Sequence, residues 1–244
     1  MRVEVISPLP GTGARQFERL LRSARPDADV RLVHAERGPS AIESWTENAL
    51  ATAEVVRLAV EAERSGADAV LIYCTADTGL YEARERVDIP VVGLMESAMH
   101  LAAMLALNFS VLTFLEETEV RFEQFARRYG LAWALRSVRA IGLPVLALDT
   151  DPALTLERLA AQAERAVVED RAHALVLGCG GFPDAESTIS RRLDALGIDV
   201  PLIEPSLAGL KMAEALADLG WRQSRRTFPH RPLNQIVGDP VGAR

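Results

Sequence analysis

Two cysteines are the residues best suited to chemistry, because each ends a short apolar run and precedes a loop of small and turn-forming residues. Cys74 follows Val70-Leu71-Ile72-Tyr73, and Cys179 follows Ala174-Leu175-Val176-Leu177-Gly178. Thiols can work as acid or base, since the pKa of a free thiol lies only modestly above neutral pH. We therefore expect the pair to act as opposed acid and base and to move a proton at a carbon centre without a cofactor.

The functional interpretation depends on a repeat, because a lone cysteine at a strand end is usually a packing residue. Residues 66–74 and 88–97 in one half match residues 171–179 and 199–206 in the other. Each half reads helix, buried strand ending in Cys, loop, helix, a strand introduced by Asp-Ile-Pro or Asp-Val-Pro, Glu and Ser, and helix. If the halves pack about a pseudo-twofold axis, the thiols face each other across a cleft. A planar carbanion between them could then be protonated from either side.

The elements that must position these thiols alternate between strand and helix. Continuous apolar strands between amphipathic helices indicate the α/β class, with parallel sheet covered on both faces. The expected strands are 3–7, 30–34, 69–74, 90–93, 109–113, 174–179 and 200–204. The expected helices are 14–24, 45–65, 98–107, 117–129, 152–169, 187–196 and 207–219.

The repeat predicts two similar α/β domains, and if they pack about a pseudo-twofold axis we expect the active site in the cleft between them. We place residues 1–97 and 207–225 in the first domain and residues 98–206 in the second. Residues 226–244 form a C-terminal tail. The chain from Trp221 onward is rich in Arg and Pro, and we expect it to lie over the surface or to be disordered.

Further candidates follow from the rule that functional groups of open parallel sheets collect beyond the carboxyl ends of the strands. The backbone after each cysteine could stabilise a thiolate or an oxyanion, and paired glycines would let it approach closely. The expected substrate-binding residues are Ser7, Thr75, Asp77, Glu96, Thr113, Gly180 and Gly181.

Several of these residues also have a purely structural interpretation. Asp77 could instead begin a turn before Gly79, and Glu96 could cap the helix that follows it. Hydroxyls at strand ends, here Ser7 and Thr113, often satisfy only local backbone groups. His100 lies in an apolar helical segment, which is more typical of a hydrogen-bonded core histidine than of a base. His34 has the same ambiguity.

Composition excludes several classes of function. A net charge of −7 and few aromatic residues argue against a nucleic-acid surface. No stretch approaches the ~20 apolar residues of a membrane span, and the N-terminus lacks signal-peptide features, so we expect a cytoplasmic protein. Two distant cysteines there are thiols, and no Cys/His spacing suits a metal. The loop Gly11-Thr12-Gly13 is no dinucleotide motif, because Gln16 replaces the third glycine.

Three segments together resemble the aspartate/glutamate/hydantoin racemase superfamily, most closely its hydantoin and allantoin racemase branch. They are Cys74-Thr75-Ala76-Asp77-Thr78-Gly79-Leu80, which fits the branch's C-x-x-D-x-G-L, Gly93-Leu94-Met95-Glu96-Ser97-Ala98-Met99-His100, and Leu177-Gly178-Cys179-Gly180-Gly181-Phe182. The resemblance implies a cofactor-independent two-thiol racemase with two α/β domains and the active site between them. Carried over, Cys74 and Cys179 are the two bases, with Asp77 and Glu96 near the site. It also implies a homo-oligomer that acts on a small-molecule substrate.

One departure from the branch leaves the substrate open. The branch usually has an N-P-N-[ST] segment after the first strand, whereas Ser7-Pro8-Leu9-Pro10 keeps only the proline. The leading hypothesis is racemisation of a 5-substituted hydantoin, allantoin or a related cyclic ureide. The alternatives are an aspartate- or glutamate-type amino-acid racemase, a maleate-type isomerase and a two-lobed small-molecule binding protein. The presence of both cysteines favours racemisation, because arylmalonate decarboxylase in the same superfamily keeps only one.

Overall fold

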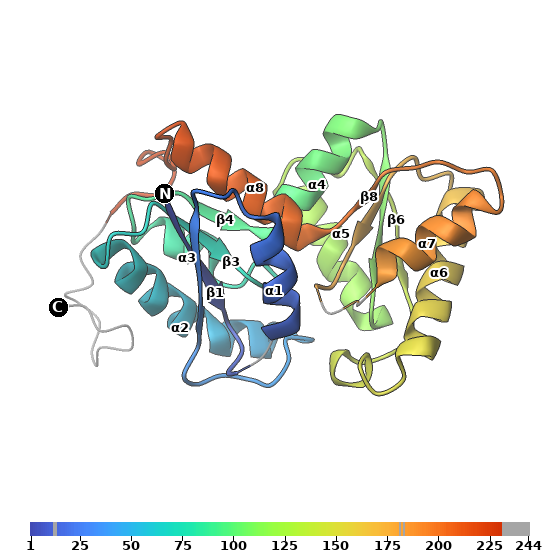
Figure 1. Cartoon of the computed structure of the whole chain (residues 1–244), viewed down its shortest axis with the longest axis horizontal. Coiled ribbons are helices and arrows are strands. Elements are labelled where there is room, and N and C mark those ends of the chain that lie inside the picture. Colours follow the sequence, from blue (N-terminus) through green and yellow to red (C-terminus); the bar gives the residue numbers. More distant parts are fainter. Residues whose placement is uncertain (12–13, 181, 183, 231–244) are drawn as a thin grey trace. The chain divides into compact units, whose positions relative to one another are not determined.

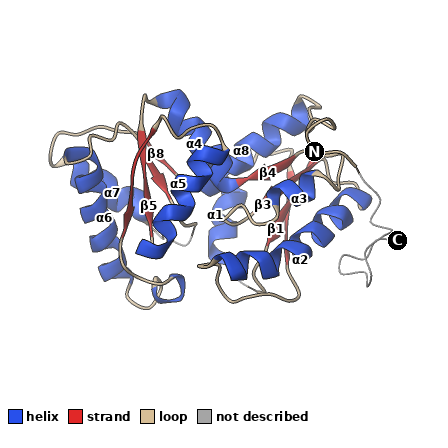
Figure 2. Ribbon diagram, turned by 180° about the vertical axis from the view of Figure 1, so that it is seen from behind, coloured by secondary structure: helices blue, strands red, loops and turns tan. Residues whose placement is uncertain are grey.

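The chain folds into two α/β units (Figure 1), seen in a computed structural model that describes residues 1–11, 14–180, 182 and 184–230. Unit 1 comprises Met1–Leu94 and the chain from Gly209 onward, and unit 2 comprises Met95–Ala208. The chain passes between the units inside two helices rather than in loops, because both boundaries fall within α4 (Leu94–Leu105) and α8 (Pro205–Asp218). In each unit the strands lie between helices (Figure 2).

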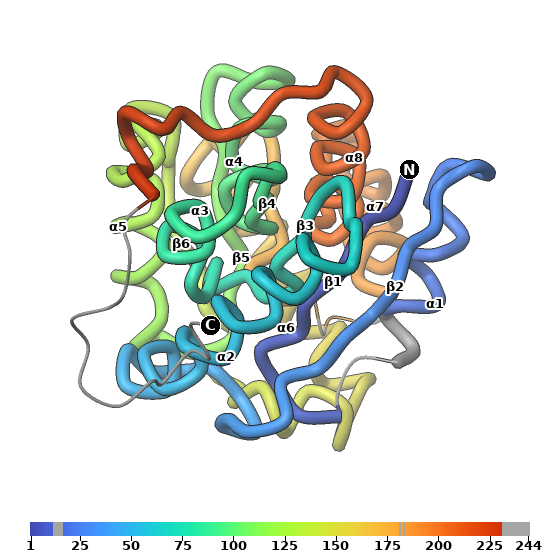
Figure 3. The backbone as a smooth tube through the Cα atoms, turned by 90° about the vertical axis from the view of Figure 1, so that its left-hand side faces the viewer, coloured from blue at the N-terminus to red at the C-terminus, as the bar shows by residue number. Residues whose placement is uncertain are grey.

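Unit 1 is built on a four-stranded parallel sheet in the order β2-β1-β3-β4. The edge strand β2 and its neighbour β1 can be followed side by side in Figure 3. The elements of unit 1 before α4 are β1 (Arg2–Ser7), α1 (Ala14–Ser23), β2 (Asp29–His34), α2 (Trp45–Arg64), β3 (Ala69–Ile72), α3 (Leu80–Arg84) and β4 (Val91–Gly93).

The strand β3 is apolar throughout because both of its faces are buried. Val70 and Ile72 pack with the apolar residues of α2 and α3. Leu71 points to the opposite face, where α8 lies so close that a Cβ on Gly209 would come within 2.7 Å of the Leu71 side chain. A strand buried on both faces cannot alternate polar and apolar residues, which explains its continuous apolar run.

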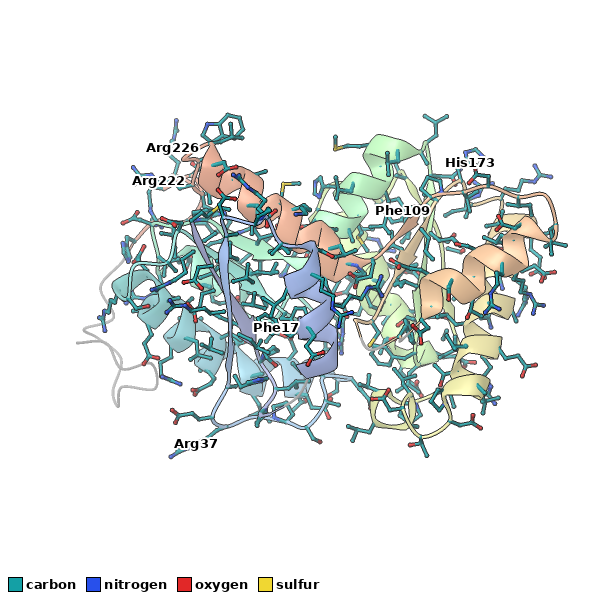
Figure 4. All side chains as sticks on the ribbon, viewed as in Figure 1. Phe17, Arg37, Phe109, His173, Arg222 and Arg226 are labelled. Carbon is teal, nitrogen blue, oxygen red and sulfur yellow. The ribbon has the colours of Figure 1, made fainter. Side chains whose placement is uncertain are left out.

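Unit 2 repeats this plan with a second four-stranded parallel sheet in the order β6-β5-β7-β8. One face packs on α4 and α5, and the other packs on α6 and α7. Phe109, at the start of β5, belongs to the first of these cores (Figure 4). The elements are β5 (Phe109–Thr113), a 3₁₀ turn (Glu116–Thr118), α5 (Glu119–Arg128), β6 (Leu135–Ala140), a second 3₁₀ turn (Val145–Ala147), α6 (Pro152–Val168), β7 (Leu175–Leu177), α7 (Ala185–Asp194) and β8 (Leu202–Ile203).

The two sheets match bond by bond, which confirms the repeat as a structural one. The residue just before each cysteine donates its N–H across the sheet, from Tyr73 to the Ile6 carbonyl oxygen at 2.8 Å and from Gly178 to the Leu112 carbonyl oxygen at 2.7 Å. Four residues before each cysteine, the N–H donates to the carbonyl oxygen of the proline in the repeated Asp-Ile-Pro or Asp-Val-Pro pattern. These bonds run from Val70 to Pro90 at 2.9 Å and from Leu175 to Pro201 at 2.8 Å.

The structure differs from the sequence-based expectation at several strands, and the strand expected at 200–204 is shorter, since β8 spans only Leu202–Ile203. The expected strands 69–74 and 174–179 end earlier, at Ile72 and Leu177, so each cysteine lies two residues beyond its strand. After β3 the cause is local, because the Cys74 N–H bonds back to the Ile72 carbonyl oxygen at 3.0 Å and leaves the sheet. The strand β6 was not expected, because its sequence Leu-Arg-Ser-Val-Arg-Ala lacks a continuous apolar run.

The chain beyond α8 lies along unit 1, with Arg222 and Arg226 just past the helix end (Figure 4). The Gln223 amide bonds both backbone groups of Val91, accepting from the N–H at 3.1 Å and donating to the carbonyl at 3.2 Å. Arg225 donates to the Asp88 carboxylate at 2.9 Å, and the Phe228 ring packs edge-on against Tyr81. This segment therefore follows the surface of the unit, as expected for the first part of the tail. Residues 231–244 lie outside the described chain.

No helix in the part of the chain that the structure describes has the length and hydropathy of a membrane span.

An ion-pair cluster ties β6 to the segment before β7. Arg139 donates to both carboxylate oxygens of Asp170, at 2.5 and 2.7 Å, and Ser137 donates to the same carboxylate at 2.6 Å. The hydrogen bond from Arg139 is the main cause that lowers the pKa of Asp170, and Ser137 adds to it. Asp170 lies in the loop between α6 and β7. The cluster therefore attaches β6, the outermost strand of the sheet, to this loop.

Replacing Asp170 with Asn should lower the free energy of unfolding at pH 7 by about 1–2 kcal/mol, since charge-assisted hydrogen bonds are lost at a partly screened site. The folded-state pKa of Asp170 is depressed, so its contribution is complete above the unfolded-state pKa and disappears as the pH falls through the folded-state value. Urea unfolding should therefore show the difference shrinking below about pH 4.

The matched control is Asp29→Asn at the outermost strand of unit 1. Asp29 pairs with Arg31 at 2.6 Å, but both side chains are more than half exposed. Exposed pairs contribute little, so this variant should unfold like the parent protein. Equal losses in the two variants would contradict the role given to Asp170.

Candidate active site

Cys74 lies at the carboxyl edge of the unit 1 sheet. The backbone bond from Tyr73 to Ile6 holds the chain at the end of β1, and Cys74 begins the loop that follows. Its side chain is half-buried. It packs beside a small apolar cluster formed by Leu9, Ile42, Ala51 and Ala76.

The loop after Cys74 is a tight double turn. The Asp77 N–H donates to the Cys74 carbonyl oxygen at 3.0 Å, and the Leu80 N–H donates to the Asp77 carbonyl oxygen at 3.1 Å. Asp77 and Gly79 both have left-handed φ, of 46° and 68°. Thr75 and Asp77 are buried despite their polarity. A backbone turn therefore begins at Asp77, within a segment that keeps its polar side chains inside.

The Asp77 carboxylate occupies space that Gly93 leaves open at the end of β4. A Cβ on Gly93 would come within 2.6 Å of the Asp77 carboxylate, and Gly93 pairs in register with Ile72 of β3. The carboxylate is thus placed at the same sheet edge as Cys74. A glycine at this strand end is required because any larger residue would displace the carboxylate.

Cys179 occupies the equivalent position in unit 2, and its side chain is buried against the core formed with α6 and α7. Glycine is required at position 178, because the backbone there lies so close to β5 that a Cβ would be 2.7 Å from the Leu112 carbonyl oxygen. Gly180 lies near Ser206, whose hydroxyl would be 3.3 Å from an added Cβ. Gly181, expected to bind substrate, lies outside the described residues.

The two strand-end hydroxyls make local hydrogen bonds. Ser7 at the end of β1 donates to the Leu9 carbonyl oxygen at 3.1 Å and accepts from the Leu9 N–H at 3.3 Å. Thr113 at the end of β5 is fully buried and shares a 2.8 Å hydrogen bond with Thr118. Both lie at the sheet edges that carry the cysteines, and both have the local partners that the structural interpretation requires.

Glu96 lies in the first turn of α4, three residues after the end of β4. Its counterpart in the repeat, Glu204, caps α8 by accepting from the N–H groups of Ser206 at 3.0 Å and Leu207 at 2.8 Å. The expectation that His100 belongs to the core is wrong. Its ring is exposed, because it lies on the outer face of α4, and its Nδ1 lies 2.7 Å from the Glu96 carbonyl oxygen.

Sequence reasoning missed the support beneath the Cys74 loop. Thr78 donates its hydroxyl proton to the Asn48 side chain of α2 at 2.7 Å. The two residues are 30 positions apart. The helix that carries Asn48 was predicted only from the periodicity of its apolar residues. The only nearby sequence signal was the Ser44–Glu47 capping box, which fixes where α2 begins.

The sheet edges with the cysteines are distinct from a hollow of about 360 Å³ along β6, whose lining contains none of the expected site residues. The lining residues are Glu116, Glu119, Ser137, Val138, Arg139, Ala140, Gln162, Arg165 and Asp170. Among the described residues no group of three or more His, Cys, Asp or Glu side chains is placed to hold a metal ion.

Unit 1 brings Ser7, Cys74, Thr75 and Asp77 to one sheet edge. Unit 2 brings Thr113, Cys179 and Gly180 to the corresponding edge of its own sheet, and it carries Glu96 in α4.

Comparison with known proteins identifies this arrangement. Residues 5–213 match the model of the Asp/Glu/Hydantoin racemase family. A hydantoin racemase of Pseudomonas sp. (strain NS671) is 34% identical over 241 residues, which cover 98% of this chain and 95% of that protein. Among solved structures, the allantoin racemase from Klebsiella pneumoniae superposes with a TM-score of 0.86 at 32% identity, covering 98% of this chain and 96% of that one.

The allantoin racemase from Pseudomonas fluorescens gives a TM-score of 0.87 at 30% identity, covering 98% of this chain and all of that one. With the family model covering most of the sequence, and relatives aligned along nearly its whole length, the chain belongs to the Asp/Glu/hydantoin racemase family of isomerases.

Proposed function

We propose that this protein racemises a 5-substituted hydantoin, allantoin or a related cyclic ureide, with Cys74 and Cys179 as its two bases. The observation that carries the proposal is the equivalence of the cysteines, each one residue past the same cross-sheet bond in its own unit. Similarity to hydantoin and allantoin racemases supports the substrate class. The reaction needs two proton-transfer groups of one kind, and the repeat supplies them.

The proton balance of the reaction needs no cofactor. The thiolate of one cysteine removes the proton from the carbon next to the ring carbonyl, so a C–H bond breaks and an S–H bond forms. The electron pair moves into the carbonyl as an enolate. The thiol of the other cysteine then gives its proton to the opposite face, and the C–H bond forms again with inverted configuration. Either enantiomer can enter, because the thiol and thiolate exchange roles.

Other residues are assigned to substrate binding. Thr75 and Asp77 are buried polar residues in the loop after Cys74. A ureide has N–H groups, and the Asp77 carboxylate can accept hydrogen bonds from them. Backbone N–H groups around Gly180 and Gly181 would stabilise the enolate oxygen. Ser7, Thr113 and Glu96 complete the set, and the local hydrogen bonds of Ser7 and Thr113 would hold those two hydroxyls in place for substrate.

Replacing either cysteine with Ser should lower kcat for racemisation by at least about 10²–10⁴-fold, the usual contribution of a positioned acid or base. A serine hydroxyl is too weak an acid to form the required anion. Each single variant should still exchange the substrate's α-hydrogen with deuterium from one enantiomer only, because one thiolate remains. Chiral chromatography measures inversion, and NMR measures deuterium uptake.

Circular dichroism and thermal unfolding of the two Ser variants control for loss of fold. If both variants fold and keep full turnover, the two-thiol mechanism is wrong. If they bind a ureide normally and the parent protein never racemises it, a small-molecule binding protein becomes the better interpretation.

A substrate panel distinguishes the cyclic ureides from the other substrates of this superfamily. We expect inversion of 5-substituted hydantoins or allantoin in ²H₂O with deuterium at the inverted carbon. Aspartate and glutamate should stay unchanged, and maleate should not isomerise. Racemisation of an acidic amino acid in preference to every ureide would overturn the substrate assignment while leaving the reaction type intact.

We also propose that the protein is a homo-oligomer. Leu107 and Trp133 precede the paired residues Phe109 and Leu135 by two positions each, and they are 78% and 68% exposed. Two large, exposed apolar side chains before neighbouring strands of one sheet favour association with a second copy. Light scattering after size exclusion should give at least twice the 26.6 kDa chain mass, and Trp133→Glu should lower it. A monomer at every concentration would contradict this proposal.

A cytoplasmic location is proposed as well, because the proposed reaction requires both cysteines as thiols and a reducing compartment keeps thiols reduced. Cell fractionation with an antibody to the protein tests it.

A further inference from the structure

One face of α2 contacts the whole loop that follows Cys74. Asn48 bonds Thr78, and Ala51 packs with Ala76 in the cluster beside Cys74. One turn further along, α2 approaches Gly79, where an added Cβ would lie 3.3 Å from both the Thr52 carbonyl oxygen and the Val55 side chain. The positions 48, 51, 52 and 55 share a helix face, so a single rigid element supports the loop from its start to its end.

The bond between Thr78 and Asn48 is the polar part of this support. Thr78 is fully buried, and its hydroxyl lies 2.7 Å from the Asn48 Oδ1 atom. It lies between Asp77 and Gly79, both of which have left-handed φ. A left-handed φ is strained at Asp77 but not at Gly79, and at a non-glycine residue it persists only where surrounding contacts hold it. The hydrogen bond therefore fixes the turn at the point where its backbone is most constrained.

The helix end that carries Asn48 is itself fixed. Ser44 caps α2 by accepting from the Glu47 N–H at 3.2 Å, and Glu47 accepts from the Ser44 N–H at 2.7 Å. Glu47 also accepts from the Glu43 N–H at 2.8 Å. Asn48 follows directly, so its amide is presented from a helix end that does not fray.

We propose that Asn48 is a positioning residue for the Cys74 thiol, acting through Thr78. This inference rests on the proposed function, because it assigns a role within the same site. Asn48 has no part in the chemistry itself. It holds the turn that begins at Cys74, where the Asp77 N–H bonds the Cys74 carbonyl oxygen. Proton transfer to carbon is sensitive to sub-ångström displacement of the base, so loosening the turn should slow catalysis more than it weakens binding.

The test uses Thr78→Val, which keeps the shape and removes the donor, and Asn48→Ala, which removes the acceptor and suits a helix. Each should lower kcat by about 10–100-fold with little change in KM. Alkylation by iodoacetamide, followed peptide by peptide with mass spectrometry, should show a changed rate and pH profile at Cys74 and none at Cys179. Thr78→Ser should restore both kcat and the Cys74 profile, and the Asn48→Ala/Thr78→Val double variant should be no worse than either single variant.

The matched control is Thr155→Val in unit 2. Thr155 is also fully buried and donates its hydroxyl proton to the Leu148 carbonyl oxygen at 3.0 Å. Its loss should lower the melting temperature without changing kcat or the alkylation of Cys74. If Thr78→Val and Asn48→Ala behave like this control, the hydrogen bond is only structural and the proposal is wrong.

Alkylation separates this inference from the proposed function. A parent protein that racemises nothing, yet whose Cys74 profile changes in Thr78→Val, would contradict the racemase and support the positioning role. If the parent protein racemises a ureide and the Cys74 alkylation profile is unaltered in both variants, the proposed function is supported and the positioning role of Asn48 is contradicted. If Thr78→Val fails to fold, Asn48→Ala alone decides by the same criteria.

Discussion

The parallel hydrogen bond from the residue before each cysteine to the neighbouring strand determines where the reactive groups lie. Tyr73 bonds Ile6 in one sheet, and Gly178 bonds Leu112 in the other. Because each bond is the last before the chain turns away, the next residue must stand at the carboxyl edge of its sheet. Everything proposed for the site depends on this register, since slipping it by one residue would turn both side chains to the other face.

The matched edges differ in the residues that surround each thiol. Tyr73 precedes one cysteine and Gly178 precedes the other, and Cys74 is half-buried where Cys179 is buried. Cys74 is followed by a turn with buried polar residues, whereas Cys179 is followed by glycine. The repeat therefore places the two cysteines at equivalent positions, and the departures from the repeat surround each cysteine with different residues.

Much of the fold could be predicted because buried parallel strands must be apolar on both faces, as Val70–Ile72 illustrates. The strand β6 could not be predicted by this rule, because it is the outermost strand of its sheet. Its polar residues Arg136, Ser137 and Arg139 are therefore tolerated, and they bond partners such as Asp170. The cysteines and Asp77 could be predicted as site residues from the local sequence. The bond between Asn48 and Thr78 was not, because it depends on how α2 lies against a turn 30 residues away.

The side-chain amide of Gln223 has a consequence beyond packing. It satisfies the N–H and carbonyl of Val91 as a peptide group of a fifth strand would. β4 is the edge strand of its sheet, and unpaired backbone groups on an edge strand can pair with another chain. Gln223 covers this part of the edge together with Arg84, which also donates to the Val91 carbonyl oxygen at 3.0 Å, so both backbone groups of Val91 already have partners within the chain.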